Sequence, residues 1–183
     1  INIALERSVD GVVQTGKLFA TRSPTGTDVA NLREQLRRLN DAGITFINAG
    51  SERDGDMDVV SELESDGLIE RPDTEPITIH KTAIYRIPPI ESRSELGQVA
   101  SYTPPDSDTE QTLLAAPRTT TPPLETGDFE RDEFVEAAPF DVDGLLLGNS
   151  RNKQLQTYTD GDESSVFAAG PTELNLRKRL LSQ

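Results

Sequence analysis

An α+β protein with one small mixed core is the fold class that this sequence predicts. Apolar residues recur at helical spacing near the N-terminus and alternate at strand spacing over residues 77–87, and proline then becomes frequent. The chain has 183 residues, and one domain takes roughly 100–200 residues, so we expect a single compact core. The sequence predicts a mixed α/β core over residues 12–87, a Pro-rich irregular arm over 88–142, and a β-meander with a helix over 143–183.

The first domain, residues 1–87, contains the clearest helix. Either Thr27 or Asp28 is suited to cap it, and Gly43 is placed to end it. Apolar residues then follow at spacings of three, four and three, which predicts one buried stripe: Val29, Leu32, Leu36 and Leu39. Short strands are expected on either side of this helix, before residue 20 and over residues 44–47.

A second helix, ended by Gly67, and a following strand are expected over residues 57–87. The run from Leu63-Glu64 through Gly67-Leu68-Ile69 to Arg71, followed by strand alternation up to Ile87, resembles the recognition helix and wing of winged-helix proteins. That resemblance implies a regulatory or adaptor protein. The family's DNA contact is missing, because this helix has only acidic charges and no Arg or Lys to meet a phosphate: Asp58, Glu62, Glu64 and Asp66.

The middle segment, residues 88–142, has the composition of a linker. Seven prolines lie between residues 88 and 123, and an acidic stretch with isolated aromatic residues follows. Such a segment gains order by binding elsewhere, so we expect it to lie across other subunits. Phe129, Phe134 and Phe140 are the predicted partner-binding residues, since isolated aromatic rings in a polar segment gain most by filling pockets.

The C-terminal segment regains periodic structure. Three short strands are expected over residues 144–148, 153–159 and 165–169, and a helix is expected to begin at Pro171.

Acidic composition restricts the partners and the environment. The net charge is −14, with 14 Arg against 4 Lys, a pattern that resembles proteins of haloarchaea and their viruses. A specific nucleic-acid partner is not expected, because phosphate binding needs clustered cations. No apolar run reaches the ~20 residues of a membrane span. The chain starts at Ile1, from which we expect a processed or trimmed terminus.

No recognisable site chemistry appears in the sequence. There is no cysteine and one histidine, His80, and no nucleophile or nucleotide-binding motif. The run from Asp54 to Asp58 has the spacing of a calcium loop, but Val59 stands where an EF-hand needs Gly and Ser65 where it needs Glu. We therefore expect no catalytic, cofactor-binding or metal-ligating residue, no cofactor, and no enzyme.

These observations together favour a structural role. The sequence predicts a non-catalytic, oligomeric scaffolding subunit of a multi-protein assembly, such as a capsid-associated, neck or tail protein in the virion of a haloarchaeal virus. The alternatives are a winged-helix-like regulatory or adaptor protein, which would be cytoplasmic, and in third place an enzyme.

Overall fold

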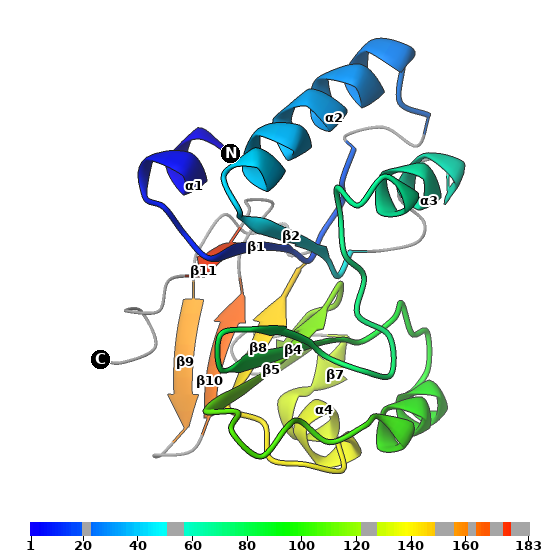
Figure 1. Ribbon diagram of the computed structural model, residues 1–183. Coiled ribbons are helices and arrows are strands. Elements are labelled where there is room, and N and C mark those ends of the chain that lie inside the picture. The colour runs from blue at the N-terminus through cyan, green and yellow to red at the C-terminus, as the bar shows by residue number, and fades with distance from the viewer. Residues whose placement is uncertain are drawn as a thin grey trace.

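Two β-sheets packed face to face between two layers of helices make up the architecture (Figure 1). The computed structural model describes residues 1–19, 23–50, 57–121 and 128–148, and beyond them the backbone of three strands. The mixed helix and strand content agrees with the predicted α+β class. None of the described helices is both long and apolar enough to span a membrane.

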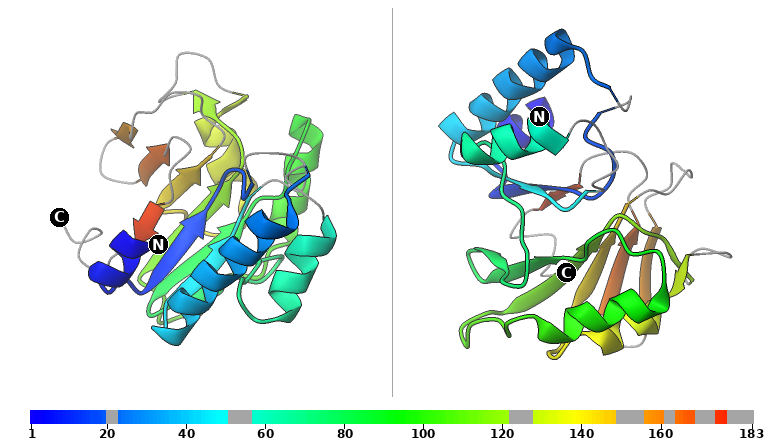
Figure 2. Two further views of the ribbon diagram at one scale, coloured as in Figure 1. Left: turned by 90° about the horizontal axis from the view of Figure 1, so that it is seen from above. Right: turned by 90° about the vertical axis from the view of Figure 1, so that its right-hand side faces the viewer.

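The smaller sheet has three strands in the order β11-β1-β2, of which β1 and β2 are parallel and β11 is antiparallel. Its strands are β1 (Gly11–Gln14), β2 (Thr45–Asn48) and β11 (Leu174–Leu176). Three helices cover its outer face (Figure 2): α1 (Asn2–Glu6), α2 (Gly26–Asp41) and α3 (Met57–Ser65). Val12 and Phe46 point into this helical layer and pack with Leu36, Leu39 and Leu63.

The larger sheet has six strands in the order β3-β4-β5-β8-β10-β9. Its four inner strands are parallel, and the two edge strands are antiparallel to their neighbours. The strands are β3 (Ile77–Ile79), β4 (Thr82–Arg86), β5 (Gln111–Ala116), β8 (Gly144–Leu147), β9 (Gln156–Asp160) and β10 (Ser164–Ala168). The 3-10 helix η1 (Arg93–Ser101) and α4 (Arg131–Ala137) cover its outer face, beside a short pair β6 (Thr120–Thr121) and β7 (Phe129–Glu130).

Strand alternation builds the layer between the sheets. Side chains at every second position of β1, β2, β4, β5 and β8 meet there and exclude water: Val13, Ile47, Ile84, Leu113, Ala115 and Leu146. Contacts at the strand ends show that the sheets run in the same sense. Gly11 at the start of β1 lies against Ile79 beside the start of β4, whereas Arg86 at the end of β4 reaches Gly50 after β2. The carboxyl ends of the parallel strands therefore lie at one edge and the amino ends at the other.

The start of α2 differs from the prediction by a few residues. Thr25, not Thr27 or Asp28, is the N-cap: the Asp28 backbone N–H donates to its Oγ1 at 3.2 Å, and the Thr25 backbone N–H donates to Asp28 Oδ2 at 2.9 Å. This reciprocal pair is a capping box. Gly43 (φ +71°) and Gly67 (φ +67°) adopt the left-handed conformation after α2 and α3, as predicted for residues that end helices.

The helix and hairpin over residues 57–87 form, but not as a separate winged-helix unit. Helix α3 leads through Gly67 to the β3–β4 hairpin. Strand β4 then pairs in parallel with β5 inside the six-stranded sheet. The helix and the hairpin were therefore predicted, but their pairing with β5 was not, because β5 lies within residues 88–142, the segment expected to be an irregular arm.

Residues 88–142 differ from the expected arm, since much of this segment packs on the chain's own sheet. Strand β5 lies in the middle of the larger sheet. Phe129 and Phe134 are buried in the core under that sheet, and the Phe140 ring stacks on Tyr85 with ring centroids 4.5 Å apart. Strand β5 was not predicted, because its apolar run, Leu113 to Ala116, is short and lies among prolines. A short, continuous apolar run is nevertheless typical of a strand that is buried on both faces of a parallel sheet.

The C-terminal strands form, although not as a self-contained meander. Strand β10 lies between β8 and β9, and β8 joins them to β5. Leu174–Leu176 form β11, where a helix was predicted. The remaining residues of that expected helix lie outside the described residues.

Candidate functional site

The carboxyl ends of the parallel strands form the first candidate site, which we call the carboxyl edge. It consists of residues at or directly after the ends of β1, β2, β4 and β8: Gln14, Thr15, Asn48, Gly50, Arg86 and Gly148. Ligands of α/β proteins bind preferentially outside the carboxyl ends of parallel strands. A ligand-binding site is therefore expected at the carboxyl edge.

Polar side chains at the carboxyl edge are buried. Gln14 and Thr15 are 8% exposed, and Asn48 and Arg86 are 6% exposed. Arg86 extends from β4 into the layer between the sheets, and its Nη2 donates to the Gly50 carbonyl at 3.4 Å. The Gly50 backbone N–H donates to Asn48 Oδ1 at 3.0 Å. Burial of an amide or a guanidinium costs free energy unless hydrogen bonds compensate, so these groups mark a polar site.

Two glycines bring backbone segments unusually close at this edge. A Cβ atom at Gly50 would lie 2.3 Å from the Gly16 carbonyl oxygen, and one at Gly148 would lie 2.1 Å from the Thr15 carbonyl oxygen. Neither position has room for a side chain, so the loops that leave β1, β2 and β8 converge tightly.

Unused hydrogen-bonding capacity remains there. Gln14 Oε1 is buried without a hydrogen-bond partner, and so is the Nε–H donor of Arg118, two residues after β5. A side-chain amide presents either an acceptor or donors in the same place, depending on its orientation. Amide groups, a hydroxyl group and two guanidinium groups are suited to an oxygen-rich anion such as a phosphate.

A metal centre is not apparent at the carboxyl edge. No group of three or more His, Asp or Glu side chains that could hold a metal ion occurs within the described residues. A guanidinium group repels a cation, and divalent metals prefer carboxylate and imidazole ligands. The described side chains of this edge therefore fit an anion better than a metal.

Tyr102 supports the carboxyl edge from the outer side of β4. Its hydroxyl group donates to the Arg86 carbonyl at 2.6 Å. Burial raises the pKa of Tyr102 to about 12 from an ordinary value of 10.0, so the hydroxyl group keeps its proton and remains a donor even at moderately alkaline pH.

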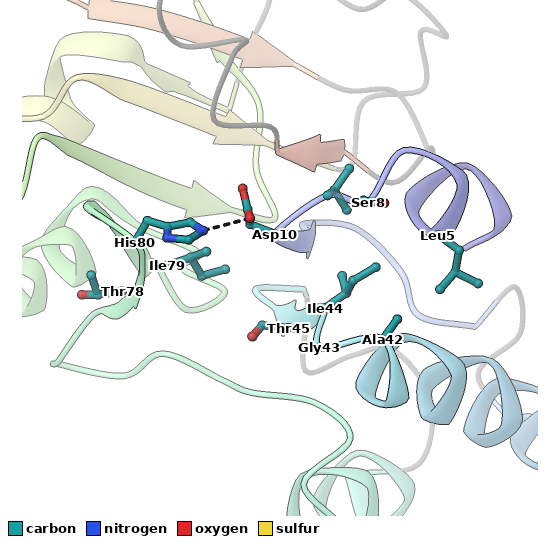
Figure 3. Close-up of a pocket in the computed structure, with 11 residues that line it drawn as sticks. Leu5, Ser8, Asp10, Ala42, Gly43, Ile44, Thr45, Thr78, Ile79 and His80 are labelled. Atoms are coloured by element: carbon teal, nitrogen blue, oxygen red, sulfur yellow. Dashed lines mark hydrogen bonds and ion pairs between the residues drawn. The ribbon is translucent and has the colours of Figure 1, made fainter.

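The opposite edge holds the second candidate site, a pocket of about 520 Å³ that we call the amino-edge pocket (Figure 3). It lies where β1 and β2 begin and where β3 turns into β4. Asp10 and His80 lie side by side in it, with Oδ1 and Nε2 2.8 Å apart.

The predicted partner-binding rings are at neither edge. Phe129 and Phe134 are inside the core beneath α4, and Phe140 packs against that core. His80 is more than half exposed and lines the amino-edge pocket. Reasoning from the sequence missed the carboxyl edge, although Gln14-Thr15-Gly16 and Asn48-Ala49-Gly50 both place a polar residue and a glycine directly after an apolar strand.

Comparison with known proteins gives relatives over almost the whole chain. DNA double-strand break repair protein Mre11 of Haloferax volcanii is 32% identical over 93% of this chain, and that of Halobacterium salinarum is 30% identical over 94%. Mre11 of Methanosarcina acetivorans is 29% identical over 96% of the chain. The chain spans only 38%, 44% and 29% of these relatives' own lengths, respectively. No protein-family model matches the chain.

These relatives correct several predictions. A virion subunit, with its capsid and head-tail role and its virion location, is wrong, because the relatives are DNA repair proteins. The cytoplasmic alternative fits such a protein. The prediction that the chain is no enzyme rested only on the absence of known catalytic motifs. The similarity to these DNA repair proteins overturns it. The exclusion of nucleic acid as a partner likewise has no support.

Proposed function

We propose that this chain acts in DNA double-strand break repair and binds the sugar-phosphate backbone of broken duplex DNA at its carboxyl edge. The similarity to Mre11 repair proteins over more than nine tenths of the chain is the observation that carries the proposal. The chain spans less than half of the length of those proteins, so the proposal concerns this chain's own contribution to repair, which we expect it to make together with protein partners.

Charge placement supports the carboxyl edge as the DNA-binding surface. The chain has 32 acidic and 18 basic residues, yet the ends of three strands carry cations: Lys17 after β1, Arg86 at the end of β4 and Arg118 after β5. Lys17 is exposed, whereas Arg86 is buried. A phosphate oxygen that approached this edge would meet both a mobile ammonium group and fixed guanidinium and amide groups.

High salt favours this kind of site over a broad basic surface. Affinity that depends on counterion release falls steeply as salt concentration rises. A protein with a net charge of −14 gains little from long-range attraction, so direct hydrogen bonds from a few pre-positioned donors have to supply the affinity.

The described residues define what this edge contributes chemically. Guanidinium, amide and hydroxyl donors bind a phosphodiester and neutralise charge that develops on its oxygens, which is the electrostatic component of phosphodiester cleavage. Within the described part of the chain, no group of three or more metal-ligating side chains accompanies these donors.

DNA binding at this edge is tested with the full chain and a labelled blunt-ended duplex, with a covalently closed circle of the same sequence as competitor. We expect the linear duplex to compete better than the circle at equal mass, because only the linear duplex has ends. Lys17→Gln and Arg118→Gln should each weaken binding several-fold, as expected for lost phosphate contacts.

Lys81→Gln is the matched control, because it removes the same charge from an exposed lysine at the amino end of β4. Its affinity for the duplex should equal that of the wild type. Equal losses for Lys17→Gln and Lys81→Gln would show a non-specific charge effect and contradict the proposed site. Gel analysis of the same reactions with Mg²⁺ or Mn²⁺ reveals whether the duplex is shortened.

A further inference from the structure

The amino-edge pocket has one wall of apolar side chains and one of hydrogen-bonding groups. Its apolar wall comes from α1, the segment before β1, the start of β2 and β3: Leu5, Val9, Ile44 and Ile79. Figure 3 shows Asp10, Thr45 and His80 on the side where β1, β2 and the β3–β4 turn meet. The volume of about 520 Å³ is within the range of ligand pockets, roughly 300–1,000 Å³.

Among the described residues that line the pocket, Asp10 is the one acidic side chain, and it gives the polar wall its negative charge. Asp10 uses Oδ1 for His80, and its second carboxylate oxygen remains to accept a hydrogen bond from a ligand. Ala42 and Gly43 follow the last turn of α2, where the helix dipole places partial negative charge. The hydroxyl groups of Ser8 and Thr45 add further acceptors. The ligand that matches this wall carries a positive charge.

Two residues near Asp10 have an unfavourable backbone conformation, one just before it in the sequence and one that contacts its side chain. Ser8 (φ 47°) and His80 (φ 54°) are the two non-glycine residues with positive φ in the described part of the chain, and both line this pocket. Such conformations are unfavourable for residues with a side chain and cluster at functional sites. The Asp10–His80 pair does not offset that cost, because the side chains are 37% and 53% exposed and exposed pairs contribute little.

Gly11 lets the two sheets approach each other beneath the pocket. A Cβ atom there would lie 2.4 Å from Ile79 Cδ1, so the glycine allows Ile79 to form part of the apolar wall. The pocket is thus built from both sheets, with its charged group at one end of an apolar surface.

We propose that the amino-edge pocket binds a lysine or arginine side chain of a protein partner. The aliphatic stem lies along Leu5, Ile44 and Ile79, and the charged head donates to Asp10, in the way that long basic side chains combine an apolar stem with a polar tip. His80 orients the carboxylate through Oδ1. Net charge complements such a partner, since a chain of −14 attracts basic surfaces and repels acidic ones. This inference is independent of DNA binding, which we place at the opposite edge.

The proposal is tested by NMR titration of the full, isotope-labelled chain, in the lowest KCl concentration at which circular dichroism shows the folded protein. The probes are Nα-acetyl-lysine N-methylamide, its arginine counterpart, and Nα-acetyl-norleucine N-methylamide, which has a similar stem without the charge. We expect the basic probes to shift the amide signals of Asp10, Ile44 and His80 with a Kd of roughly 1–10 mM, about 4 kcal/mol or less of binding free energy. The norleucine probe should bind several-fold more weakly, because it lacks the charge that pairs with Asp10.

Asp10→Asn should reduce binding of the lysine probe several-fold, as expected for the loss of one partly exposed ion pair. Glu136→Gln is the matched control: it removes the same charge from an exposed position on α4, across the larger sheet from the pocket, and should bind the probe as the wild type does. Norleucine binding as tightly as lysine, or Asp10→Asn retaining wild-type affinity, would overturn the proposal. Lys17→Gln should leave lysine binding intact, so failure of the DNA proposal and failure of this one are distinguishable.

Discussion

The two edges of the sheet pair use opposite means to hold polar groups. At the carboxyl edge, Arg86 and Asn48 are 6% exposed and are held by the backbone of Gly50. At the amino edge, Asp10 and His80 are 37% and 53% exposed and contact each other beside an open pocket. Both edges join the smaller sheet to the larger one, but only the carboxyl edge removes its polar groups from water.

Because the polar groups of the two edges differ in burial, substitutions at the two edges should affect stability and binding differently. A buried polar group costs free energy if its partner is lost, so substitutions at the carboxyl edge act on folding as well as on ligand binding. An exposed pair contributes at most about 1 kcal/mol to stability. Substitutions at the amino edge therefore report binding with little effect on the fold.

The largest expected effect is at the glycines. Gly148→Ala should lower the free energy of unfolding by about 3 kcal/mol, because the new methyl group would lie 2.1 Å from the Thr15 carbonyl oxygen, a backbone atom. Gly11→Ala should cost only about 1 kcal/mol, since the atom it meets at 2.4 Å, Ile79 Cδ1, is the end of a flexible side chain. Urea unfolding monitored by circular dichroism measures both values.

Gly97→Ala supplies the control for this pair, because a Cβ atom at Gly97 meets nothing within 4 Å. Its stability should remain within roughly 0.5 kcal/mol of the wild type. A larger loss for Gly11→Ala than for Gly148→Ala would reverse the comparison and show that the amino edge is the tighter one.

Arg86→Met is expected to have the next largest effect. The substitution keeps an apolar stem but removes the donor to the buried Gly50 carbonyl, and an unsatisfied buried carbonyl costs about 2 kcal/mol. Arg86→Lys should lose less, because it keeps the charge while losing the planar fork. If Arg86→Met proved as stable as the wild type, the guanidinium would have no structural role, and its burial would point to ligand binding alone.

Sequence reasoning succeeded where the signal was local. Helix α2 with the buried Leu36 and Leu39 of its stripe, the ends of α2 and α3 at Gly43 and Gly67, and the β3–β4 alternation were predicted, because each depends on residues close in the chain. Val29 and Leu32, at the other end of the stripe, are only partly buried. The central position of β5 was missed, since parallel pairing depends on distant strands and prolines surround its short apolar run.

The sites were missed for the same reason. Arg86 becomes part of the carboxyl edge only when β4 stacks over the end of β2, and Asp10 meets His80 across 70 residues of sequence. Phe134 is a different case: its acidic neighbourhood predicted a ring that fills a pocket on a partner, whereas helix α4 directs this ring into the chain's own core. Composition gives only the average polarity of a segment, whereas a helix needs a single apolar face to pack on the core.

Alkaline pH should lower the free energy of unfolding through Tyr102, by less than Gly148→Ala and Arg86→Met do. Burial raises the pKa of Tyr102 to about 12 from an ordinary value of 10.0, so the folded state holds this proton more tightly than the unfolded state. The stabilisation is fully present below pH 10 and is lost as pH rises from 10 to 12. At pH 11 the expected loss is roughly 1 kcal/mol. Urea unfolding of the wild type and Tyr102→Phe at pH 9 and pH 11 tests this, and the phenylalanine variant should lose less on going from pH 9 to pH 11.

The smallest expected effect on stability is at the amino edge. Asp10→Asn and His80→Gln should each change the free energy of unfolding by less than roughly 0.5 kcal/mol, because both side chains of the pair are substantially exposed and solvent screens their attraction. His80→Gly should instead raise stability by up to about 1 kcal/mol, since glycine adopts the left-handed backbone at φ 54° without strain. Thermal and urea unfolding of the three variants measure these differences. A loss above 2 kcal/mol for Asp10→Asn would mean that the pair holds the two sheets together, and the exposed pocket would then be explained by stability rather than by binding.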